Sequence, residues 1–82
     1  MYRLLQLAPG SYDLELNGEV IGSVVRTGSH HRSVKWYAEL IDEEGVRPPP
    51  FTRAEHKFPS LEELASWLGD AEVNPTYRIV PR

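Results

Sequence analysis

The clearest fold signal lies in residues 12–21, which read Tyr12-Asp-Leu-Glu-Leu-Asn-Gly-Glu-Val-Ile21. Apolar and acidic side chains alternate strictly over residues 12–16, and this period of two predicts a strand with one buried face. Asn17-Gly18 is a strong hairpin signal, because a type I′ turn needs positive φ at both positions. The segment therefore predicts two antiparallel strands, 12–16 and 19–26, joined by a two-residue turn.

The rest of the chain predicts two more strands and a helix. Residues 34–41 are rich in β-branched and aromatic side chains, which favours a third strand, and a short fourth strand is expected over 54–58. Ser60-Leu-Glu-Glu63 is a capping box, so a helix should begin at Ser60 and end near Gly69. The expected fold is α+β: a three- to four-stranded antiparallel β-meander with one C-terminal amphipathic α-helix packed on one face. The apolar stripe of that helix is Leu61, Leu64, Ala65 and Leu68.

Length and composition indicate one small globular domain. The chain of 82 residues has room for a single domain, 1–82, with its core expected over about 11–69 and a tail, 70–82, that forms an edge strand or frays. Hydrophobic residues make up 40% and charged residues 26%, as in ordinary globular proteins. The chain has no cysteine, no long apolar stretch and no recognisable signal peptide, so we expect a cytoplasmic protein without membrane contact.

No group of residues predicts catalysis or cofactor binding. The histidines are His30, His31 and His56, and they lack the helical i, i+4 spacing or the cysteine partners typical of zinc sites. No serine lies in a G-x-S-x-G turn, and Glu62 and Glu63 point to different sides of their helix. We therefore expect a non-enzymatic domain with no catalytic residues, no metal and no cofactor.

The sheet face turned away from the helix is the leading candidate for a binding site. The tight turn should place Leu16 opposite Glu19 and Leu14 opposite Ile21. Strict alternation then leaves an apolar patch on the second face, and such a patch is unusual in water. The cover is either the chain itself, through the N-terminal segment 2–7 or the tail, or a protein partner or second copy. The predicted protein-binding patch consists of Val20, Val24, Tyr37 and Ile41.

Nucleic-acid binding is the alternative function. The net charge of −3 removes any general attraction to phosphates, so binding would need a local basic patch. Residues 26–35 contain three cations, two histidines and no acid, and aromatic residues follow directly. The predicted contacts are Arg26, His30, His31, Arg32 and Lys35.

Two segments carry a resemblance to known DNA-binding domains. Trp36-Tyr-Ala-Glu-Leu40 followed by Phe58-Pro-Ser-Leu-Glu-Glu-Leu-Ala-Ser-Trp-Leu68 resembles the arm-binding domain of tyrosine integrases and the plant AP2-type domain. The resemblance implies three strands and a helix, with the exposed sheet face in the DNA major groove. Here that face would carry Asp13, Glu15 and Glu39, which oppose phosphate binding. A second likeness, to antitoxin-type domains, implies a protein partner instead.

Overall fold

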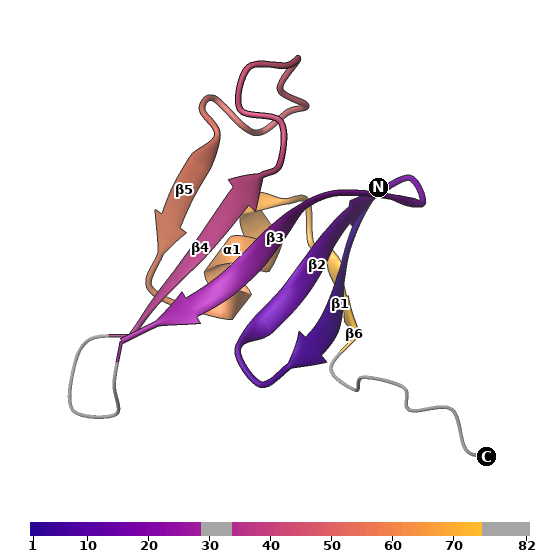
Figure 1. Cartoon of the computed structure of the whole chain (residues 1–82). Helices are drawn as coiled ribbons and strands as arrows, with labels where there is room; N and C mark the ends of the chain where they lie inside the picture. The colour runs from indigo at the N-terminus through magenta and orange to yellow at the C-terminus, as the bar shows by residue number, and fades with distance from the viewer. Residues whose placement is uncertain (29–33, 75–82) are drawn as a thin grey trace.

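The protein has an α+β fold in which one helix packs on one face of a sheet (Figure 1). The computed structural model describes residues 1–28 and 34–74. Six strands in the order β5-β4-β3-β2-β1-β6 form the sheet. The elements are β1 (Tyr2–Ala8), β2 (Ser11–Leu16), β3 (Glu19–Thr27), β4 (Lys35–Leu40), β5 (Glu55–Phe58), α1 (Leu61–Trp67) and β6 (Glu72–Asn74).

The sheet is larger than predicted and it is mixed. Strands β1 to β5 pair antiparallel, whereas β6 runs parallel to β1. The prediction of three or four purely antiparallel strands was wrong because β1 and β6 carry weak local signals. In β1, Leu4 and Leu5 are adjacent, which breaks the alternation, and β6 has only three residues. Both are strands because a neighbour pairs with them. The edge strand suggested within residues 75–82 lies outside the described residues.

The hairpin at Asn17-Gly18 is confirmed, but the register beyond it is not. Asn17 and Gly18 have φ of 54° and 90°, and Leu16 pairs with Glu19 as expected. A β-bulge then adds one residue to β3, so Leu14 pairs with Gly22 and not with Ile21. Because side chains alternate along a strand, the extra residue moves every later residue of β3 to the opposite face.

The core lies between the sheet and α1. Its largest fully buried side chains come from four elements and are Leu4, Leu14, Val24 and Leu64. The helix begins as predicted: the Ser60 hydroxyl accepts a hydrogen bond of 3.1 Å from the Glu63 backbone N–H. Trp67 then packs against aromatic rings, with centroid distances of 4.9 Å to Phe51 and 4.6 Å to His56. The core thus reaches from β1 to the end of the helix.

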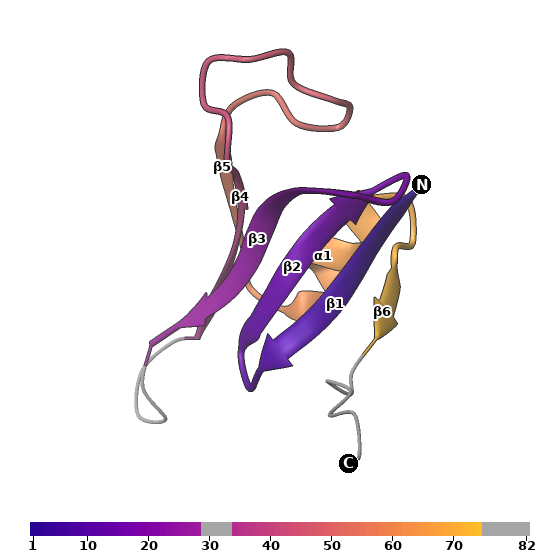
Figure 2. The same cartoon turned by 45° about the vertical axis from the view of Figure 1, so that its right-hand side comes forward.

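The face of the sheet opposite α1 is open in the part of the chain that the structure describes. Figure 2 shows α1 on one side of β1, β2 and β3, with no second layer on the other side. The N-terminal segment does not cover this face, because it forms β1 within the sheet. The described helix, at seven residues, is also far too short to cross a membrane. We call the side chains that point away from α1 the outer face.

Candidate functional site

The outer face is organised into rows that run across the strands. One row is apolar at its centre and contains Ser11, Val25, Tyr37 and Lys57, which pair in sequence across β2, β3, β4 and β5. The next row is acidic and contains Leu5, Asp13, Ser23, Glu39 and Glu55. Apolar, acidic and basic side chains therefore lie in two adjacent rows of a single surface.

The predicted protein-binding patch is only partly on this surface. Val20 and Ile41 lie on the outer face and are 43% and 69% exposed, and Tyr37 is half-buried. The predicted position of Val24 on the outer face is wrong: Val24 pairs with Tyr12, faces α1 and is 0% exposed. The bulge in β3 is the physical reason, because it turns Val24 inward and Val25 outward. The sequence did not predict Val25 on the outer face, where it pairs directly with Tyr37.

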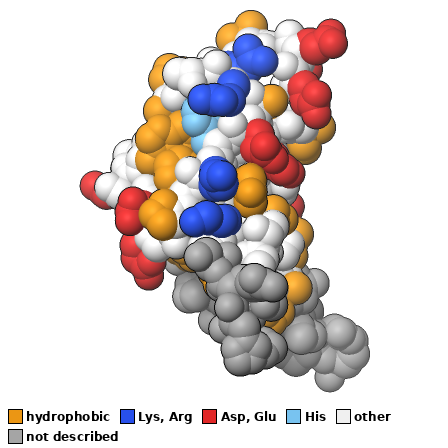
Figure 3. Space-filling view, turned by 90° about the vertical axis from the view of Figure 1, so that its left-hand side faces the viewer, with side chains coloured by type: hydrophobic (Ala, Val, Ile, Leu, Met, Phe, Trp, Pro, Cys, Tyr) orange, Lys and Arg blue, Asp and Glu red, His pale blue; other side chains and the backbone are white. Residues whose placement is uncertain are grey.

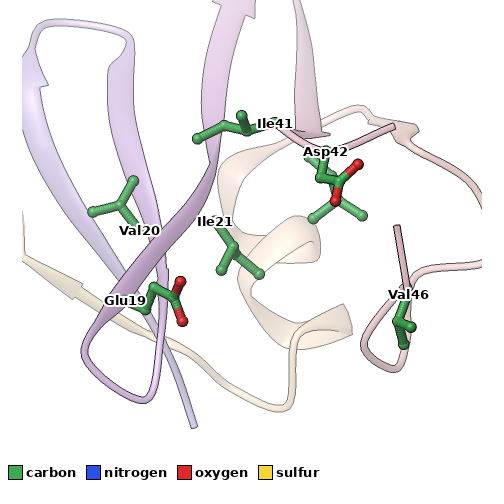
Figure 4. Close-up of a pocket in the computed structure, with 7 residues that line it drawn as sticks. Glu19, Val20, Ile21, Ile41, Asp42 and Val46 are labelled. Carbon is green, nitrogen blue, oxygen red and sulfur yellow. The ribbon is translucent and has the colours of Figure 1, made fainter. Parts of the chain in front are cut away.

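A shallow depression marks the end of the outer face near Val20. Its volume is about 320 Å³, and it lies between the start of β3 and the loop that follows β4. Figure 4 shows Ile21 in the middle of the lining residues, with Val20 and Ile41 on one side of it and Val46 across the gap. Glu19 and Asp42 add two carboxylates to the rim. The depression can accept an apolar side chain that is flanked by a cation.

Two carboxyl groups oppose each other across β4 and β5. Glu39 pairs directly with Glu55. A hydrogen bond with the Glu55 side chain raises the pKa of Glu39 above its usual value, and burial and the negative charges of Glu55 and Glu43 act in the same direction. Like charges directly opposite each other destabilise a sheet. This pair therefore costs the fold some stability at neutral pH.

We expect Glu39→Gln to stabilise the protein at pH 7 by about 0.2–1 kcal/mol, the usual size of a cross-strand pair effect. An acid with a raised folded-state pKa contributes stability below its unfolded pKa and loses it as pH rises through the folded pKa. The gain should therefore vanish below about pH 4.5, the ordinary value for glutamate. Urea unfolding at both pH values tests this, with the exposed Glu19→Gln as control. Equal effects of the two variants would contradict it.

The structure separates the described members of the predicted nucleic-acid set. Arg26 pairs with Trp36 on the helix side of the sheet, whereas Lys35 pairs with Thr27 on the outer face. Lys35 instead lies two residues from Tyr37, whose cross-strand partner is Lys57. Figure 3, which views the molecule from the side of β5, shows Lys and Arg side chains gathered in a column. The other predicted contacts, His30, His31 and Arg32, lie outside the described residues.

His56 has a structural role. The Thr52 backbone N–H donates to its Nε2 at 3.2 Å, and the ring packs between Phe51 and Trp67. Burial and then the positive charge of Arg53 lower the pKa of His56, which favours the neutral ring that can accept this bond. Among residues 1–28 and 34–74, no three His, Asp or Glu side chains are placed to hold a metal ion.

No family model, curated protein or solved structure matches this chain. The functional proposal below therefore depends on the geometry of the outer face.

Proposed function

We propose that this domain is a protein-binding module that acts through its outer face. The observation that supports this is an outer face that is open among the described residues, with an apolar centre formed by Val25 and Tyr37 and with Val20 and Ile41 exposed beyond the acidic row. An antiparallel sheet that is solvated on one side normally alternates to polar residues there. Apolar groups that gather on an open face are typical of an interaction surface.

The charges on this face support the same proposal. The Glu39–Glu55 pair is unfavourable for the isolated domain, and departures from local stability rules concentrate at functional sites. The apolar row next to an acidic row suits a partner that presents apolar side chains beside cations. The depression between Ile41 and Val46 offers a place for one such side chain.

Site-specific photo-crosslinking in the source cells tests the proposal. A photoreactive phenylalanine analogue at Tyr37 or Ile41 should give the same covalent protein adduct from both positions. The matched control is Glu62, which is exposed on α1, on the other side of the sheet. Adducts at Glu62 that equal those at Tyr37 and Ile41, or no adduct at either outer-face position, would contradict binding through this face.

Nucleic-acid binding is the second candidate, and the position of Lys35 and Lys57 beside Tyr37 favours it. Cations flanking an aromatic ring suit phosphates and a stacked base. A residue-resolved NMR titration with DNA at low salt separates the two candidates. Shifts at these three residues that added salt reverses would favour nucleic acid, because release of counterions makes such binding salt-dependent.

A further inference from the structure

Strand β5 is a free edge of the sheet in the described part of the chain, as Figures 1 and 2 both show. The Leu40 N–H donates to the Ala54 carbonyl oxygen at 2.8 Å. Since hydrogen-bonded pairs alternate in an antiparallel ladder, His56 and Phe58 also direct their backbone groups toward β4. The N–H and C=O groups of Glu55 and Lys57 therefore point outward from the edge. They can pair with another strand.

The side chains on this edge are complementary to a second copy of themselves. Glu55 and Lys57 are both exposed and lie on the same face, with His56 between them. If an identical strand is laid antiparallel beside β5 with the two His56 residues opposite each other, each Glu55 faces the Lys57 of the other copy. Opposite charges directly across a ladder stabilise the pair.

Among the registers centred on residues 55, 56 or 57 of β5, only the one centred on His56 is favourable. Centring the pair on Glu55 places two glutamates opposite each other and also sets Lys57 against Arg53, which are both cations. Centring it on Lys57 places two lysines opposite each other. Like charges in these positions are destabilising, so the charge order along β5 selects the arrangement centred on His56.

We infer that two copies of this protein pair β5 to β5, antiparallel, about a two-fold axis at His56, so that two six-stranded sheets become one. Each Glu55–Lys57 pair exchanges two backbone hydrogen bonds, and both pairs are equivalent by symmetry. The cation of the second copy also lies beside Glu55, where it offsets the repulsion between Glu55 and Glu39. The contact joins the two outer faces into one continuous surface.

A depression of about 450 Å³ lies over the outer face of β4 and β5 and is lined by Tyr37, Arg53, Glu55, His56 and Lys57. Edge strands are often short and carry lysine, which discourages pairing with other strands. In β5, Glu55 lies two residues from Lys57. Like charges therefore meet in the shifted registers, whereas opposite charges meet in the register centred on His56.

The dimer is expected to be weak. A contact along one four-residue strand buries far less than the roughly 1,600 Å² of a standard interface, so its Kd should be on the order of 0.1–1 mM. Sedimentation and amide NMR from about 20 µM to about 1 mM cover this range. We expect the sedimentation coefficient to rise with concentration, and the amide signals of residues 55–57 to shift.

Charge exchange provides the decisive test. Glu55→Lys and Lys57→Glu should each weaken self-association by about tenfold or more, since each sets like charges opposite each other. An equimolar mixture of the two variants should associate again, because every cation of one copy then meets an acid of the other. The double variant Glu55→Lys/Lys57→Glu should also associate, as its charges are exchanged but complementary.

A proline variant tests the backbone contact. Lys57→Pro removes an N–H that β4 does not use, and proline is tolerated at such edge positions. It should weaken association more than Lys57→Gln, which removes the charge alone. Well-dispersed amide spectra establish that each variant is folded; if a single variant unfolds, the double variant decides.

Three results would overturn this inference: no self-association up to about 1 mM, equal association of the single charge variants and the wild type, or no recovery in the mixture. Concentration-dependent shifts confined to Val20, Val25, Tyr37 and Ile41 would also overturn it, since they place the contact on the outer face. That last result would support binding through the outer face while it excludes pairing through β5. The experiment therefore distinguishes failure of one proposal from failure of the other.

Discussion

Replacing Leu4 by alanine should lower the free energy of unfolding by about 2–5 kcal/mol. Leu4 is fully buried beneath α1 and pairs with Leu14. The truncation removes apolar area from the core and leaves a cavity that neighbouring side chains fill only partly. A domain of this size has a total stability of roughly 4–12 kcal/mol, so the variant should be close to unfolding at 37 °C.

Urea unfolding of Leu4→Ala beside Leu7→Ala makes the comparison within one strand. Leu7 lies on β1 but is 45% exposed, so its truncation should cost about 1 kcal/mol or less. If Leu4→Ala lowers the free energy of unfolding as little as Leu7→Ala does, β1 is not part of the core.

The Gly22→Ala variant should lose about 3 kcal/mol through overpacking. A β-carbon at Gly22 would overlap the carbonyl oxygen of Glu39 and lie 3.0 Å from its carbonyl carbon. These are backbone atoms of β4, so no side-chain rotation relieves the contact. The strands must separate where Gly22 pairs with Leu40, next to the bulge.

The neighbouring variant Ser23→Ala is the matched control for Gly22→Ala. Ser23 lies on the outer face and already carries a β-carbon, so alanine adds no atom there and should change stability by about 0.5 kcal/mol or less. Thermal unfolding measures both, and the loss at Gly22 should lower Tm by about 12–24 °C. Unchanged stability of Gly22→Ala would show that β3 and β4 tolerate wider spacing.

The candidate site could be predicted from sequence as a surface but not as a set of residues. Val20, Tyr37 and Ile41 were assigned to the outer face, whereas Val24 and Val25 were exchanged by the bulge. A glycine inside a predicted strand indicates a bulge or a close approach of another backbone, so Gly22 was the available signal. The cross-strand pairing of Lys57 with Tyr37 could not be predicted, because no local sequence rule sets the register between β5 and β4.

Local sequence signals are sufficient for the elements that depend on neighbouring residues. Asn17-Gly18 makes the hairpin because both residues accept positive φ, and Ser60 begins α1 because its hydroxyl reaches the Glu63 N–H three residues later. These interactions close within a few residues, so they do not depend on the rest of the fold.

The extent of the sheet and the face on which each valine lies depend on tertiary contacts. Strand β6 forms through pairing between distant segments, because its partners in β1 lie almost seventy positions earlier in the chain. Gly22 lies beside the bulge in close contact with the backbone of β4, and the bulge moves Val24 into the core. Because side chains alternate with a period of two, that single extra residue determined which apolar groups are buried and which remain available for binding.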